Sequence, residues 1–185
     1  MGEGVVEKLK QEFDLTVDWI GIEIHPETPA GGRPLTELFP AADIKRMTNH
    51  LRTMAAPFGI TFADFANLPN SRNAHLAAEY ARAQGKFPEL HASLFSAYFS
   101  EGLDISDLEI LAELAKDAGL DSAELVRSIQ QGTFSEKLSQ AQKKAKDHDV
   151  SGVPAFFIGD KERIMGAQPI EVFRKVLKTI ESNRS

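Results

Sequence analysis

Two short clusters of histidine and carboxylate side chains are the residues whose types could bind a metal ion. Glu23, His25 and Glu27 alternate along one segment, and residues 147–149 read Asp-His-Asp. Imidazole and carboxylate groups are common ligands of transition metals. However, His25 precedes Pro26, which is typical of the end of a strand. Residues 147–149 lie where a helix is predicted to end, and a histidine near a helix C-terminus interacts favourably with the helix dipole. We therefore assign no metal site and expect no cofactor.

Nucleophilic catalysis is the next chemistry that the residue types could support, and here the sequence offers little. The chain has no cysteine. Because the thiolate is the nucleophile and the metal ligand of cysteine, thiol exchange and thiolate metal sites are both excluded for these 185 residues. His75 and His91 lie on apolar helical segments without a serine partner that would indicate a triad. No catalytic residue is assigned.

Composition and charge limit the classes of partner. With 42% hydrophobic and 26% charged residues, the 185-residue chain is typical of one globular domain, with or without an insertion. The 21 basic and 27 acidic residues give a net charge of −6, so phosphate backbones and anionic lipids are not attracted. No apolar stretch approaches the roughly 18 residues of a membrane span, and the start lacks the pattern of a secretory signal. We expect no nucleic acid partner, no membrane association and a cytoplasmic location.

Hydrophobic periodicity gives the order of elements. It predicts the following, in sequence: a helix over about 5–13, an alternating strand over 15–24, a Pro- and Gly-rich loop over 25–40, a helix over 41–57, a short extended piece over 60–65, four helices between about 70 and 150, a hairpin over 153–165, and a final helix after Pro169.

Helix boundaries in the middle of the chain carry clear signals. Ser106 with Glu109 has the spacing of a capping box, and Asp121 stands three residues before another glutamate. Gly119 and Gly132 lie where glycines end helices.

Several of these segments resemble one known family. Gly152–Ile158, which reads Gly-Val-Pro-Ala-Phe-Phe-Ile, is similar to the cis-proline strand of the DsbA-like thioredoxin family. Gly166–Pro169 resembles the segment between hairpin and helix in its FrnE-like branch, and Asn70–His75, Ala97–Gly102 and Asp104–Asp107 are similar to the helical insert of that branch.

The resemblance, which extends from Gly2 to about Leu177, implies the fold class. We expect an α/β thioredoxin-like fold with a large all-helical insertion and with its first strand missing. The implied organisation has three parts: residues 1–65 form the truncated N-terminal part of the thioredoxin-like domain, residues 66–150 the helical insertion, and residues 151–185 the C-terminal ββα part.

One departure from the family concerns the chemistry. Members begin with a strand that leads into Cys-Pro-x-Cys, an aromatic, a variable residue and a glycine, and only Met1-Gly2 matches the last two positions. The family activity is thiol-disulfide oxidoreductase or isomerase, and its N-terminal cysteine is the attacking thiolate. We therefore expect these 185 residues to be redox-inactive, and the coding sequence upstream of Met1 to encode the absent strand and motif.

The resemblance also implies a binding edge. It makes the Val153–Pro154 bond cis and gives Gly152, Val153 and Pro154 to substrate binding, with the Val153 N–H and C=O pairing with an extended thiol- or disulfide-containing peptide or a glutathione-like backbone. The alternative is a trans proline that merely starts an edge strand.

Three functions remain open. The first is an enzyme, a thiol-disulfide oxidoreductase or isomerase of the DsbA-like family. The same architecture also occurs in 2-hydroxychromene-2-carboxylate isomerases and kappa-class glutathione transferases, where a serine takes the first motif position, so a glutathione-dependent enzyme belongs to this first alternative. The second function is a non-catalytic peptide-binding module, and the third is a structural role. Because the absent strand would lie between residues 15–24 and 153–159, we expect that these two strands close up, that a segment of another molecule fills the gap in a homodimer, or that the protein is poorly stable and partly open there.

Overall fold

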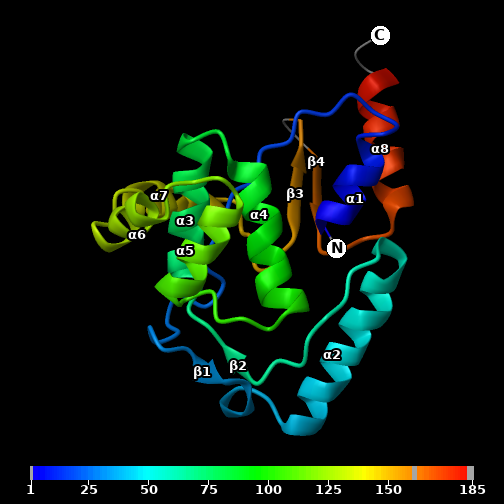
Figure 1. Cartoon of the computed structure of the whole chain (residues 1–185). Helices are drawn as coiled ribbons and strands as arrows, with labels where there is room; N and C mark the ends of the chain where they lie inside the picture. Colours follow the sequence, from blue (N-terminus) through cyan, green and yellow to red (C-terminus); the bar gives the residue numbers. More distant parts are fainter. Residues whose placement is uncertain (1, 160–161, 183–185) are drawn as a thin grey trace. The chain divides into compact units, whose positions relative to one another are not determined.

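The computed structural model describes residues 2–159 and 162–182. Its helices and strands are, in chain order, α1 (Gly2–Leu9), β1 (Arg33–Pro34), α2 (Ala41–Ala55), β2 (Asn67–Leu68), α3 (Arg72–Ala83), α4 (Phe87–Phe95), α5 (Leu108–Asp117), α6 (Ser122–Gln130), α7 (Ser135–Asp147), β3 (Ala155–Ile158), β4 (Glu162–Met165) and α8 (Ile170–Ser182), as Figure 1 shows. A π-helix over Ser96–Ser100 continues α4. None of the described helices has both the length and the apolar character that a membrane span needs.

The chain forms two compact units. The first, here the hairpin unit, comprises Met1–Ile20 and Lys144–Ser185. The second, here the helical unit, comprises Gly21–Lys143. The sequence predicted an α/β fold with a large all-helical insertion, and the division into a unit that holds β3 and β4 and a mostly helical unit that holds the short β1 and β2 agrees with this fold class.

The hairpin unit packs two helices against one antiparallel hairpin. Helices α1 and α8 lie side by side (Figure 1). Their apolar stripes supply the core together with one residue of β4; the buried residues are Val5, Val6, Leu9, Phe13, Ile164, Phe173 and Leu177. The ring of Phe173 meets that of Phe156 edge to face, with centroids 4.8 Å apart.

Strands β3 and β4 form the predicted hairpin in one continuous register. Ala155 pairs with Met165 and Ile158 pairs with Glu162. One face of this ladder is apolar and buried, since Ile164 is 6% exposed, whereas its neighbour Arg163 is exposed. The alternation of buried and exposed side chains is what a two-residue period dictates.

The strand expected over residues 15–24 does not form as a paired strand. Burial alternates regularly between partly buried and exposed from Leu15 to Ile20, as in a strand. Within the described chain, however, no β-ladder includes this segment. A ladder needs a neighbouring backbone, and the alternating pattern alone cannot supply one. The alternation expected for a strand is present from Leu15 to Ile20, but the segment forms no ladder within the described residues.

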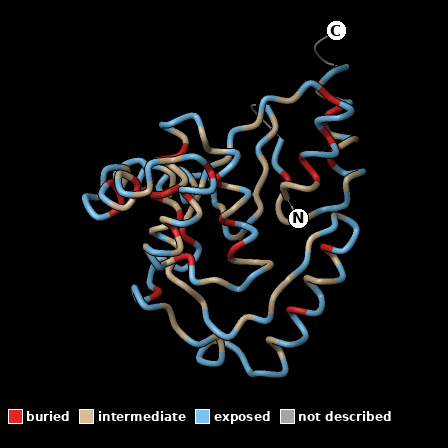
Figure 2. Tube along the Cα trace, viewed as in Figure 1, coloured by how far each residue is buried: buried red, intermediate tan, exposed pale blue. Residues whose placement is uncertain are grey.

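The helical unit has a continuous apolar core, which Figure 2 shows as the buried segments of its helices. Helices α3 to α6 and one leucine of α7 contribute to it; the buried residues are Ala74, Leu76, Ala77, Tyr80, Ala81, Leu90, Leu94, Ile105, Leu111, Ala115, Ala118, Leu125, Ile129 and Leu138. Leu90, Leu111 and Leu125 are completely buried.

The predicted helix boundaries are confirmed at most positions. The Asp121 carboxylate accepts a hydrogen bond from the Glu124 N–H at 2.9 Å and caps α6, and Gly119 and Gly132 have φ of +76° and +65°. The capping box at Ser106 was wrong by one residue: Asp107 caps α5 by accepting from Glu109 N–H. Ser106 instead donates its hydroxyl to Asp104.

A two-stranded ladder, β1 with β2, was missed by sequence reasoning. Arg33 pairs with Leu68 and Pro34 with Asn67. The glycine that precedes it has φ of +72°, and a Cβ there would lie 2.8 Å from the Leu68 carbonyl oxygen. Gly32 is therefore required by both conformation and space.

Truncation of a core leucine should destabilise the helical unit strongly. Leu111→Ala removes a completely buried side chain, so we expect the free energy of unfolding to fall by about 2–5 kcal/mol. Glu113→Ala changes an exposed residue of the same helix and should change it by less than about 0.5 kcal/mol. Urea titration followed by circular dichroism measures both, and equal effects of the two substitutions would contradict this core.

Candidate functional site

The three predicted binding residues lie at the entry to β3. Val153 is the most exposed large apolar side chain of the described chain, with 58% of its surface accessible. The Val153–Pro154 peptide bond is cis. The Pro154 carbonyl accepts a hydrogen bond from the Gly166 N–H at 2.8 Å, which fixes this residue to the end of β4. Gly166 has φ of +76°, a conformation that favours glycine.

The amino end of α1 lies directly against this entry. A Cβ added at Gly2 would lie 3.1 Å from the Cβ of Pro154 and 3.3 Å from Cζ of Phe156. These distances are tighter than ordinary van der Waals contact, so any larger residue would displace its neighbours. The first turn of a helix has N–H groups without intrahelical partners, and here that turn adjoins Pro154.

The backbone of Val153 is available for hydrogen bonding. Within the described chain, no backbone or side-chain group bonds to its N–H or to its carbonyl oxygen. Backbone groups of this kind are paired in most buried positions, and an exposed pair can accept an incoming chain. Val153 thus combines an exposed side chain with two backbone groups that no other described residue bonds.

An ion pair holds α8 to the segment that follows α1. The guanidinium of Arg174 donates from Nε to Oε2 of Glu12 at 2.8 Å, and it also pairs with Glu171. The hydrogen bond from Arg174 lowers the pKa of Glu12, against a smaller opposing effect of desolvation. The pair therefore links α8 to the segment that follows α1.

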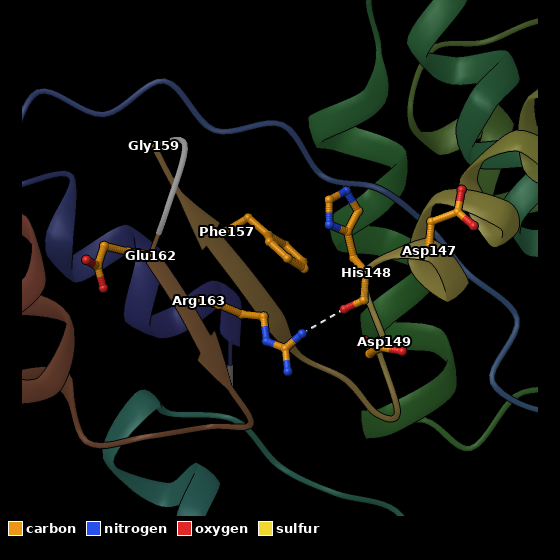
Figure 3. Close-up of a pocket in the computed structure, with 7 residues that line it drawn as sticks. All are labelled: Asp147, His148, Asp149, Phe157, Gly159, Glu162 and Arg163. Atoms are coloured by element: carbon orange, nitrogen blue, oxygen red, sulfur yellow. Dashed lines mark hydrogen bonds between the residues drawn. The ribbon is translucent and has the colours of Figure 1, made fainter.

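A second candidate is a cavity of about 330 Å³ beside the hairpin. Figure 3 shows Phe157 and Arg163 extending toward His148, whereas Glu162 points away from them. The His148 and Phe157 rings are 5.2 Å apart between centroids, and Arg163 Nη1 donates to the His148 carbonyl oxygen at 2.7 Å. The other lining residues are Asp147, Asp149 and Gly159.

This cavity contains residues 147–149, for which the sequence predicted solvation and helix termination rather than a metal site. Helix α7 ends at Asp147, and Val150 N–H bonds to the Ala145 carbonyl, so the segment closes the helix. No group of three or more His, Asp or Glu side chains that could hold a metal exists in residues 2–159 and 162–182. The seven described lining residues also include no hydroxyl nucleophile.

His75 and His91 of the helical unit pack against their neighbours. His91 lies between Phe87 and Phe95, with ring centroids 4.9 Å and 4.6 Å away. His75 lies against Gly21, where a Cβ would be 2.5 Å from its Nδ1. Burial lowers the pKa of His75, although a hydrogen bond to the Ile22 backbone opposes this.

One interaction that positions the extended segment has no sequence signal. The side-chain amide of Gln142 accepts from the Glu23 N–H at 3.0 Å and donates to the Glu23 carbonyl at 2.8 Å. It thus pairs with the backbone as a neighbouring strand would. The Glu23 carboxylate, in turn, accepts from Arg72 at 3.2 Å. A glutamine on a polar helix face gives no sequence signal that its amide pairs with the backbone of a distant segment.

Comparison with known proteins identifies the class. The model of the DSBA-like thioredoxin domain matches residues 1–178, and the chain belongs to that family. This confirms the family expected from Gly152–Ile158 and the helical insert, while the assignment to the FrnE-like branch stays a prediction.

Individual relatives agree with this family. The chain is 29% identical over 184 residues to the uncharacterized protein YwbO of Bacillus subtilis, covering 96% of this chain and 88% of that protein. Its fold is similar to that of a probable DsbA oxidoreductase of Streptomyces coelicolor, with a TM-score of 0.87, 23% identity and coverage of 100% and 85% of the two chains. A 2-hydroxychromene-2-carboxylate isomerase shares the fold with a TM-score of 0.71, 21% identity and coverage of 97% and 86%.

Replacing Arg174 should remove the ion pair to Glu12 and so raise the pKa of Glu12. In Arg174→Gln we expect the pKa of Glu12 to rise toward its ordinary value, because the main cause of its lowering is removed. A carboxyl group whose pKa is lower in the folded state stabilises the fold at pH values above its unfolded-state pKa, and this stabilisation is lost as the pH falls through the folded-state pKa. The stability that the protein loses on acidification should therefore be smaller in the variant. Carboxyl NMR titration measures the pKa.

The control for this titration is Arg46→Gln, which removes an exposed arginine paired with Asp43 on α2. It should leave the pKa of Glu12 unchanged. An unchanged Glu12 pKa in Arg174→Gln as well would show that the ion pair does not hold α8 in solution.

Proposed function

We propose that this DsbA-family chain binds extended thiol- or disulfide-containing peptides at Gly152, Val153 and Pro154 and that its 185 residues perform no disulfide exchange themselves. The observation that carries the proposal is Val153, which is 58% exposed and has both backbone groups unpaired within the described residues. An extended peptide adds to such an edge through main-chain hydrogen bonds.

The family supplies the chemical context of this edge. Thiol-disulfide exchange proceeds by attack of a thiolate on a disulfide sulfur. The chain has no cysteine, so binding and exchange are separated in it. The proposed binding edge is the entry to β3, which the amino end of α1 adjoins.

The interaction is expected to be weak. Two backbone hydrogen bonds contribute about 0.5–1.5 kcal/mol each, and covering Val153 adds a modest hydrophobic gain. For a short peptide without further anchors we expect a Kd on the order of 1 mM. A family member that performs thiol-disulfide exchange would gain affinity for its substrate from the covalent step or from the contacts of a larger substrate.

Peptide binding should depend on the backbone of the ligand. We expect a seven-residue peptide with β-branched residues around a central S-methylthio-cysteine to shift the amide resonance of Val153, whereas the same peptide N-methylated at alternate residues should not, because N-methylation removes the donors. The amide of Val172, an exposed valine on α8, serves as the control within the chain. Equal binding of both peptides would contradict backbone pairing at Val153.

The 185-residue chain should not reduce insulin. With dithiothreitol as reductant, we expect precipitation of insulin at the uncatalysed rate, because no thiolate is present to form the mixed disulfide. Turbidity at 650 nm follows the reaction, and a cysteine-containing thioredoxin is the positive control. Turnover above the uncatalysed rate by cysteine-free protein would refute the separation of binding from exchange.

A further inference from the structure

Residues 21–23 are the segment at which the chain passes from the hairpin unit into the helical unit. The first part of the hairpin unit ends at Ile20, and the helical unit begins at the next residue. Two contacts fix the end of this segment: Gln142 bonds to both backbone groups of Glu23, and Arg72 bonds to its carboxylate. Neither contact involves a group that ordinarily changes its charge near neutral pH.

The start of the segment is held differently, by the ring of His75 on α3. A Cβ at Gly21 would lie 2.5 Å from the His75 Nδ1, so the ring lies directly on the glycine and leaves no room for a larger residue. The same ring is hydrogen-bonded to the backbone of Ile22. Since imidazole is the side chain that ordinarily changes its charge between about pH 5 and 8, this contact can respond to pH, unlike those of Glu23.

Charged side chains surround this ring on α3 and on α7. Arg72, Glu79 and Arg82 follow the same helical spacing as His75 and so share its face of α3. The Glu79 carboxylate pairs with Lys137 of α7 and with Arg82, and it is the charged group that favours a protonated His75. The other face of α3 packs toward α4, α5 and α6 and supplies core residues: Ala74, Leu76, Ala77, Tyr80 and Ala81.

Docking of the segment favours the neutral form of the ring. Burial lowers the pKa of His75 and outweighs the opposing effects of the Ile22 hydrogen bond and of Glu79. A ring whose pKa is lower when the segment is docked binds a proton more readily when the segment is undocked. Protonation therefore shifts the equilibrium toward the undocked segment, and the shift develops as the pH falls through 6.5, the ordinary pKa of histidine, toward the lower value of the docked ring.

We propose that His75 is an acid-sensitive latch on the connection between the two units: its neutral ring holds Gly21 and Ile22 against α3, and protonation of the ring releases them. Glu23 stays attached through Gln142 and Arg72, so the release is local. It adds two residues, about 7 Å when extended, to the free chain that leads into the helical unit. The latch does not depend on the peptide binding proposed above.

An NMR titration of the 185-residue chain tests the latch. In the wild-type chain we expect the His75 ring to titrate with a midpoint below 6.5 and the Ile22 carbonyl carbon to shift with the same midpoint. Gly21→Ala places a methyl group where the ring lies, so the pKa of His75 should rise toward 6.5 and the Ile22 shift should lose its pH dependence. Gly31→Ala is the matched control: a Cβ there meets nothing within 4 Å, so both titrations should remain as in the wild type.

Three outcomes of this titration would overturn the proposal: a wild-type His75 ring that titrates at or above 6.5, an Ile22 carbonyl carbon that does not follow the ring, or a Gly21→Ala variant in which both titrations are unchanged. Circular dichroism checks that the variants fold.

If Gly21→Ala does not fold, His75→Gln takes its place, since glutamine keeps a hydrogen-bond donor without a change of charge. The free energy of unfolding, measured by urea titration, should then fall less in His75→Gln than in the wild type between about pH 7.5 and about pH 5. His50→Gln, which replaces an exposed histidine of α2, should keep the full wild-type loss. An equally large loss in His75→Gln and in the wild type would refute the latch.

Discussion

The backbone ladder between β3 and β4 determines what the rest of the hairpin unit can do. The Gly166 N–H satisfies the Pro154 carbonyl, and this one bond sets which residues of β3 face β4 and which face outward. Helices α1 and α8 cover the apolar face of the ladder, and Arg174 joins α8 to Glu12. The proposed binding of a peptide at Val153 follows from the backbone groups that this register leaves on the outer side.

Membership of the DSBA-like family and the absence of cysteine concern different parts of a thiol-exchange reaction. The family's chemistry needs a thiolate, whereas the proposed binding of an extended peptide needs an unpaired backbone edge. In this chain the edge at Val153 and the packing of Gly2 on Pro154 are present. The cavity around His148 and Phe157 is a poor alternative, because Glu162 points out of it and the carboxylates do not converge.

Much of this architecture was predictable because it depends on local signals. The apolar run before Gly159 gave the hairpin, and Asp121 gave a helix start, since both rest on nearest neighbours in the chain. Residues 15–20 had the correct period, but pairing depends on another backbone and was not encoded locally. The Gln142 amide bound to the backbone of Glu23 joins positions 119 residues apart, and no pattern in either segment indicates it. The candidate residues Gly152, Val153 and Pro154 were located through the resemblance of Gly152–Ile158 to a family, whereas the exposure and the unbonded backbone groups of Val153 depend on the tertiary fold and have no local signal.

Hydrogen exchange of the β3 amides tests the central claim, an unoccupied outer edge, most directly. In dilute protein without peptide, the account predicts slow exchange at Phe156 and Ile158, whose amides bond to β4, and fast exchange at Val153, Ala155 and Phe157. The two sets alternate along one strand, so global unfolding cannot produce the difference. Slow exchange at Ala155 and Phe157 under the same conditions would show that another backbone already covers this edge and would contradict the account.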